Sequence, residues 1–120
     1  MSLLCNAFKI NNSVCVNTGE VIISSNNLTT SFVNTCTVIA FKYDNIKFMA
    51  HLDDLKPNME NLVNEKLLLV DLSKIKKIYI WVGSKCFNNC PSLILAKKIS
   101  KKIGIKKTVY LKSASNIISI

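Results

Sequence analysis

The chain has 120 residues and a formal net charge of +9 at pH 7, and all 16 of its basic residues are lysines. Nearly half of the residues are apolar, which excludes a disordered chain and fits one domain spanning residues 1–120. The absence of arginine argues against a nucleic-acid-binding protein, because base readout and bidentate phosphate contacts favour arginine.

No apolar run is long enough for a membrane span, and residues 1–12 lack the charged and apolar regions of a cleavable signal peptide. Five cysteines without an export signal indicate reduced thiols in a cytosol-like compartment. We therefore expect a cytoplasmic protein, located in a host cytoplasm if this lysine-, asparagine- and isoleucine-rich chain comes from a virus or an intracellular pathogen. A toxin secreted without a cleavable signal is the alternative.

Runs of β-branched and aromatic residues predict most of the elements as strands. The strands are expected at 20–24, 28–32, 37–43, 46–52, 76–82 and 107–112, with short apolar pieces at 7–10, 13–16 and 116–120. Two helices are expected, one at 59–69 with Asn58 as its cap and one at 91–103. This order predicts an α+β fold, a layered mixed and antiparallel sheet flanked by helices.

The stretch 37–52 predicts a β-hairpin with a two-residue turn at 44–45, because an Asp-Asn pair tolerates the positive φ of tight hairpin turns. Counting outward from this turn places Val38 opposite His51. Because side chains alternate between faces, Cys36 and His51 share one face as diagonal neighbours, with Cα atoms about 7–8 Å apart. A three-residue turn would shift the register by one residue and separate them.

A thiol beside an imidazole is the minimum apparatus for nucleophilic catalysis. An ordinary cysteine thiol, with a pKa of about 8.5, is mostly protonated at neutral pH, whereas a histidine partner favours the thiolate and can protonate a leaving amine. The alternative is structural, since cysteines are often buried and a single histidine near a strand is often a core residue. The spacing of Cys36 and His51 leaves both interpretations open.

Three features around this pair form a pattern. Thr30 precedes Cys36 by six residues, and the run Phe48-Met49-Ala50-His51 ends in the histidine. Farther along, a predicted strand ends in the small residues Gly83-Ser84 and is followed by a helix. In these features the chain resembles the CheD-type chemoreceptor glutamine deamidases and their relatives among bacterial deamidase toxins, the cytotoxic necrotizing factors and Burkholderia lethal factor.

The resemblance implies a CheD-like cysteine hydrolase without a cofactor, acting on a protein substrate that carries a target glutamine. It implies that Cys36 attacks the side-chain carboxamide, that His51 activates the thiol and protonates the departing ammonia, and that Thr30 orients His51. Asp53, on the Cys36 face in the counted register, is the second candidate for orienting His51. By analogy, backbone N–H groups of the loop 83–89 hold the oxyanion.

The chain departs from this family at two places. Asn34-Thr35 stands where the family has a glycine-serine pair before the cysteine, and Gly83-Ser84 where it has a double glycine. The chain also resembles the protein N-terminal asparagine amidohydrolases, whose cysteine and His-x-Asp pattern is matched by Cys36 and His51-Leu52-Asp53. The alternatives are therefore such an amidohydrolase, or a catalytically inactive relative that acts as a binding module.

Other polar clusters carry weaker predictions. Asp53-Asp54 with one histidine, and Cys86 with Cys90, provide too few ligands, so no metal site is expected. One charge cluster lies on and after the second helix. It consists of Lys97, Lys98, Lys101, Lys102, Lys106 and Lys107. This lysine-rich face is either a solvated surface or a contact for an acidic partner or an anionic membrane.

Overall fold

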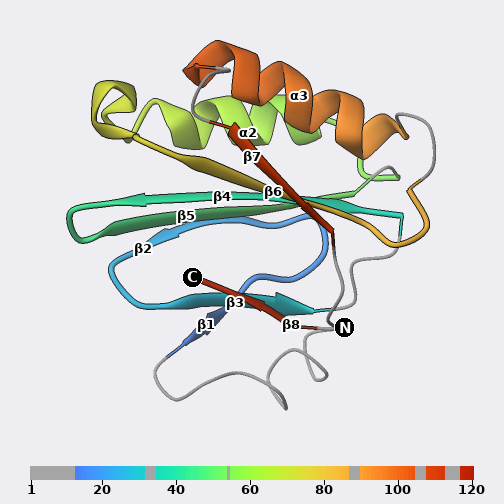
Figure 1. Cartoon of the computed structure of the whole chain (residues 1–120), viewed down its shortest axis with the longest axis horizontal. Coiled ribbons are helices and arrows are strands. Elements are labelled where there is room, and N and C mark those ends of the chain that lie inside the picture. Colours follow the sequence, from blue (N-terminus) through green and yellow to red (C-terminus); the bar gives the residue numbers. More distant parts are fainter. Residues whose placement is uncertain (1–12, 32–34, 54, 87–89, 105–107, 113–116) are drawn as a thin grey trace.

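The structure, a computed structural model, describes residues 13–31, 35–53, 55–86, 90–104, 108–112 and 117–120. Over these ranges the chain forms two α-helices, one short 3-10 helix and eight strands. Figure 1 shows them as three layers: the α-helices, a five-stranded sheet and a three-stranded sheet. The predicted α+β class, with helices packed on mixed sheets, is confirmed.

The five-stranded sheet forms the middle layer, in the order β2-β5-β4-β6-β7. Its strands are β2 (Val21–Ser24), β4 (Thr37–Tyr43), β5 (Ile46–Leu52), β6 (Ile78–Val82) and β7 (Thr108–Lys112). Neighbouring strands are antiparallel except β6 and β7, which are parallel. Parallel neighbours need a crossover connection, and here it contains helix α3 (Pro91–Ile103).

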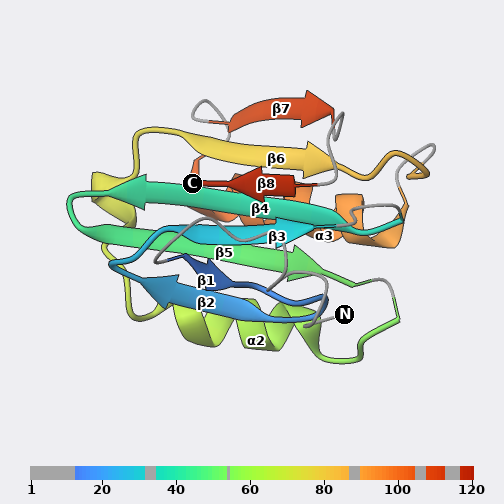
Figure 2. The ribbon, with the colours of Figure 1, turned by 90° about the horizontal axis from the view of Figure 1, so that it is seen from below.

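The three-stranded sheet has the order β1-β3-β8. Its strands are β1 (Val14–Cys15), β3 (Leu28–Ser31) and β8 (Ile117–Ser119). The central strand β3 pairs in parallel with β1 and antiparallel with β8. Figure 2 shows β3 lying across the hairpin strands β4 and β5. The hairpin is thus covered on one face by the helices and on the other by the small sheet.

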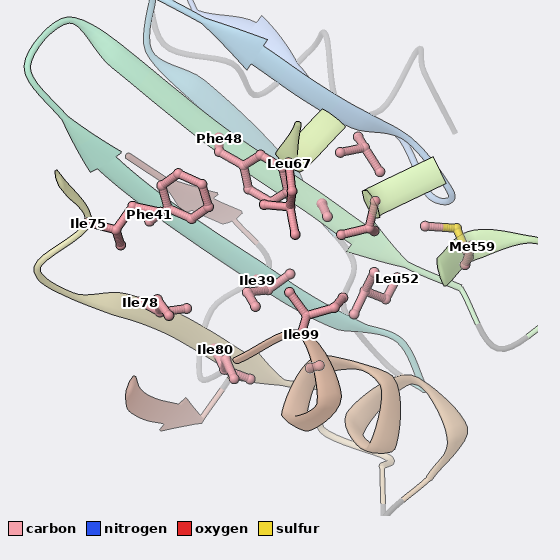
Figure 3. Packing of buried hydrophobic residues seen from close by; sticks show 14 of the residues in the cluster. Ile39, Phe41, Phe48, Leu52, Met59, Leu67, Ile75, Ile78, Ile80 and Ile99 are labelled. Atoms are coloured by element: carbon pink, nitrogen blue, oxygen red, sulfur yellow. The ribbon is translucent and has the colours of Figure 1, made fainter. Parts of the chain in front are cut away.

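Two apolar clusters separate the layers. The cluster between the large sheet and the helices includes Phe41 and Phe48, whose stacked rings have centroids 4.6 Å apart (Figure 3). The cluster between the two sheets includes Val38, Ala40 and Met49. Side chains of β4 alternate between the two clusters, which explains why its sequence is apolar almost without interruption.

Helix α2 (Met59–Leu67) ends two residues earlier than predicted, because the chain tightens into i→i+3 hydrogen bonds from Leu69 to Lys66 and from Val70 to Leu67. Asn58 is the N-cap residue, as predicted, and its carbonyl accepts a hydrogen bond from Leu62 N at 3.1 Å. Asn58 precedes the helix with φ 63° and its side chain makes no cap hydrogen bond.

The remaining boundaries agree closely with the sequence. Strand β6 starts two residues later than predicted, a 3-10 helix (Leu72–Lys74) precedes it, and α3 has the predicted bounds. The predicted piece at 7–10 and the predicted strand ends at 32, 107 and 116 lie outside the described residues. Within the described ranges, neither helix is long and apolar enough to cross a membrane.

Candidate active site

The hairpin has the predicted register. Tyr43 pairs with Ile46, and Val38 pairs with His51. Asp44, the first turn residue, has a φ of 49°, the positive value that two-residue hairpin turns need at this position. Because Val38 packs in the cluster between the sheets, the side chain of His51, directly opposite on the same face, points into that space as well.

The main chain of His51 is held by two hydrogen bonds to the segment that leads into β2. Its carbonyl accepts a hydrogen bond from Gly19 N at 2.8 Å, and its N–H donates to the carbonyl of Glu20 at 3.0 Å. The residue has no exposed surface. The imidazole therefore occupies a defined place between the two sheets.

Thr30 approaches the same imidazole from the small sheet. Its Oγ1 lies 2.7 Å from His51 Nδ1, and only 1% of the residue is exposed. Thr30 belongs to β3 and His51 to β5, so this hydrogen bond joins the two sheets. The contact between the predicted orienting residue and His51 is present.

The hydrogen bonds assign the tautomer of His51. Thr30 Oγ1 also lies 2.6 Å from the carbonyl oxygen of Val16. A carbonyl only accepts, so the single hydroxyl proton of Thr30 goes to Val16. Thr30 Oγ1 must then accept a hydrogen bond from His51, which places the ring proton on Nδ1. The lone pair that can take a proton is on Nε2.

His51 Nε2 is buried and has no hydrogen-bond partner among the residues that the structure describes. A buried polar atom left unpaired costs about 1–3 kcal/mol. Such atoms are rare and call for an explanation, which is often a catalytic role. The basic nitrogen of His51 is therefore available for proton transfer.

The protonation state follows from burial. Desolvation lowers the pKa of His51 from 6.5 to about 4, and the negative charge of Asp53 opposes this shift only in part. The imidazole is therefore neutral at pH 7, with Nε2 able to accept a proton. His51 is thus a neutral base on the face of the sheet that bears the Cys36 thiol, and its Nε2 makes no hydrogen bond to that thiol.

Cys36 lies one residue before β4 and carries a thiol. It packs in the cluster between the sheets together with Val38 and Met49, and 9% of the residue is exposed. Cys36 and His51 are therefore on the same face of the large sheet, as the register predicted.

Asp53, the second candidate for orienting His51, has another role. Its Oδ1 accepts a hydrogen bond from Leu55 N at 3.0 Å, while Nδ1 of His51 bonds to Thr30. Asp53 acts on the imidazole through its charge, which raises the pKa of His51 against the larger effect of burial. Asp54 lies outside the described residues.

The prediction that the cysteines are reduced thiols is wrong for three of them. Cys86 and Cys90 form a disulfide with Cα atoms 5.5 Å apart, and Cys15 is also disulfide-bonded. The sequence could not show this, because the pairing depends on how the loop after β6 folds back toward α3. Within the described ranges, no three His, Cys, Asp or Glu side chains gather to form a metal site.

The start of the loop predicted to hold an oxyanion lies near Cys36. Val82 pairs with Thr37, so the loop begins at the end of β4 where Cys36 precedes the strand. Residues 87–89 of this loop lie outside the described ranges. Its oxyanion role stays a prediction by analogy.

Sequence reasoning missed Ser92, in the first turn of α3. Ser92 Oγ lies 3.0 Å from the carbonyl oxygen of Thr35 and 2.9 Å from Thr37 Oγ1. These two residues flank Cys36. The only local signal was a serine directly after a helix-starting proline, which does not indicate what the helix start contacts.

Two lysines of the lysine-rich face of α3 form contacts within the molecule. Lys98 forms an ion pair with Glu60 of α2 at 3.0 Å, and Lys102 donates to Asn64 Oδ1 at 3.1 Å. These two lysines join the helices across the outer layer. Lys106 and Lys107 lie outside the described residues.

Replacing Thr30 with valine should destabilise the fold by about 1–3 kcal/mol, because it leaves His51 Nδ1 and the Val16 carbonyl without a buried partner. It should also slow alkylation of Cys36, because the proton of His51 is no longer held on Nδ1. Urea unfolding and mass-spectrometric alkylation rates measure the two effects.

Thr29→Val is the matched control for this variant. Thr29 is the neighbouring buried threonine of β3, and its hydroxyl donates to the carbonyl of Ile118 at 3.1 Å. This substitution should lower stability without slowing the alkylation. Equal alkylation rates in both variants would mean that Thr30 is only structural.

Comparison of the chain with protein-family models finds no match, and comparison with curated proteins finds no significant one. The candidate site is therefore judged on its geometry.

Proposed function

We propose that this chain is a cysteine amidohydrolase that converts glutamine side chains of a protein substrate to glutamate and ammonia. Cys36 is the nucleophile, His51 the general base and acid, and Thr30 the residue that orients His51. One observation carries the proposal. His51 Nδ1 donates to Thr30, and the basic Nε2, on the face of the sheet that bears a thiol, has no hydrogen-bond partner in the described part of the chain.

The reaction follows from these atoms. Nε2 of His51 takes the thiol proton as Sγ of Cys36 attacks the carboxamide carbon. The tetrahedral intermediate collapses as the imidazolium gives this proton to the departing nitrogen, which releases ammonia and leaves a thioester. Water, activated by the same nitrogen, hydrolyses the thioester to glutamate and restores the thiol. No cofactor takes part in these steps.

The burial of the thiol favours a side-chain amide over a peptide bond as the substrate. Only 9% of Cys36 is exposed. A peptide bond has polypeptide chain on both sides, which hinders its approach to a thiol buried to this extent. A glutamine carboxamide stands at the end of a flexible side chain and has a smaller cross-section than a peptide bond within a chain. This supports a deamidase rather than a protease.

Location is part of the proposal. One proposal is a substrate in a cytoplasm, the host's if the chain comes from a pathogen. The disulfides are typical of oxidising compartments and favour the alternative, a protein exported without a cleavable signal. The lysine-rich face of α3 is proposed as a contact for an acidic partner.

A library of glutamine-containing peptides and folded proteins provides the test. The wild-type chain should release ammonia and convert glutamine to glutamate, as detected by mass spectrometry, and Cys36→Ala should do neither. Peptides with an N-terminal asparagine distinguish the alternative amidohydrolase. A wild-type chain that releases no more ammonia than Cys36→Ala would favour the inactive binding module.

A further inference from the structure

Ser92 contacts both residues next to Cys36. Its Oγ bonds to the carbonyl of Thr35 at 3.0 Å and to the hydroxyl of Thr37 at 2.9 Å. Ser92 is 2% exposed and Thr37 is fully buried. Water therefore competes little for the bond between Ser92 and Thr37, whereas Thr35 is an exposed residue and its bond is partly buried. Loss of the Ser92 hydroxyl leaves the buried Thr37 hydroxyl without its partner in this network.

The direction of the two bonds follows from the number of protons. The Thr35 carbonyl can only accept, so Ser92 donates its single proton to it. Ser92 Oγ then accepts the proton of the Thr37 hydroxyl. One serine thus holds the peptide unit before Cys36 through a main-chain oxygen and the residue after it through a side chain.

Cys36 needs such support because it lies outside the strand ladder. The pairing of β4 with both β5 and β6 ends at Thr37, so the ladder does not fix the backbone of the preceding residue. The hydrogen bond of Ser92 to the Thr35 carbonyl lies two residues before that end. The two hydrogen bonds of Ser92 fix the backbone on either side of the nucleophile.

Ser92 itself belongs to a rigid frame. It follows Pro91, the first residue of α3, and Cys90, at the helix start, is bonded to Cys86 in the loop after β6. Helix α3 packs on β4, β5 and β6. The serine is thus held against the same sheet that carries Cys36 and His51.

We propose that Ser92 is a positioning residue that sets the direction of the Cys36 thiol relative to His51. The inference rests on the proposed function, since it assigns Ser92 a role in the Cys36–His51 pair. Displacing a reacting group by about 1 Å can slow a reaction by about a hundredfold. We therefore expect Ser92→Ala to lower the His51-dependent alkylation rate of Cys36 by about 10- to 100-fold and to shift its pH profile toward that of an ordinary thiol.

The test compares Ser92→Ala with Ser100→Ala. Ser100 lies on the same helix, is fully buried, and is hydrogen-bonded to the hydroxyl of Thr108, but it contacts neither neighbour of Cys36 in any described bond. Both variants should lose stability in urea unfolding. Only Ser92→Ala should change the pH profile of iodoacetamide labelling at Cys36.

Thr37 provides a second pair of variants should Ser92→Ala fail to fold. Thr37→Ser keeps the hydroxyl that donates to Ser92 and should keep the wild-type profile, whereas Thr37→Val removes it and should reproduce the slow labelling. A wild-type profile in Ser92→Ala and Thr37→Val, with labelling still dependent on His51, would overturn the role of Ser92 alone. Labelling that does not depend on His51 in the wild type would overturn the proposed function, and the positioning role with it.

Discussion

Replacing His51 with alanine should slow the alkylation of Cys36 by about 10²–10⁴-fold near neutral pH, the usual contribution of a general base. In the wild type, Nε2 of the neutral imidazole takes the thiol proton. Without this base the thiol must lose its proton to solvent, as an ordinary cysteine with a pKa of about 8.5 does. Iodoacetamide labelling, located at Cys36 by mass spectrometry, measures the rate.

The direction in which the labelling rate changes with pH follows from the pKa of His51. His51 has a pKa of about 4, so the nitrogen can accept a proton above that pH and not below it. Wild-type labelling should therefore persist well below pH 8 and fall as the pH drops through about 4. The His51→Ala variant should label only as the pH approaches the ordinary thiol range.

Val38→Ala is the matched control for His51→Ala. Val38 pairs directly with His51 and is fully buried, so its truncation opens a cavity beside Cys36 without removing the base. Rapid labelling in Val38→Ala, and recovery of His51→Ala on adding imidazole, would support base catalysis. Equal slowing in both variants would make the histidine a packing residue.

The second prediction with a large expected effect concerns the free energy of unfolding at acidic pH. His51 has a pKa of about 4 in the folded chain, against 6.5 when unperturbed, so the unfolded chain binds more protons between these values. Stability must therefore fall as the pH is lowered from 6.5 to about 4, and it is unaffected by this group above that window. At 1.36 kcal/mol per pKa unit, His51 alone should lower the free energy of unfolding by about 3 kcal/mol.

The substitution His51→Gln isolates the contribution of His51 to the pH dependence of stability. His51→Gln cannot titrate, so the stability difference between wild type and variant should change by about 3 kcal/mol across the window, as measured by urea unfolding at several pH values. Carboxylates titrate in both chains and cancel in the comparison. A constant difference would mean that His51 is not desolvated in the folded protein.

The hairpin could be predicted because its turn and its register depend on residues that are close together in the sequence. The Asp44-Asn45 turn has two residues, and once its length is known the register from Tyr43–Ile46 to Val38–His51 follows by counting. The same counting placed Cys36 and His51 on one face. Local sequence thus determined which side chains of the candidate site share a surface.

Contacts between the layers could not be predicted from the spacing of residues in the sequence. The approach of Thr30 to His51 depends on how the small sheet packs on the hairpin, and it was expected only through a family resemblance. The contacts of Ser92 depend on where the crossover between β6 and β7 places α3. The Cys86–Cys90 disulfide depends on a loop conformation, for which the sequence gives only the separation of the two cysteines.

Strand β3, which carries Thr30, pairs with a strand formed by residues far along the chain. Thr30 pairs with Ile118 of β8, and Thr29 donates to the Ile118 carbonyl across a separation of 89 residues. The hairpin with Cys36 and His51 closes a short loop and can form early, whereas β8 closes a very long one and is expected to dock late. A partly folded chain would then hold the thiol and the imidazole without the hydrogen bond that fixes the tautomer. The part of the thiol reactivity that depends on His51 would therefore be complete only once β8 has docked.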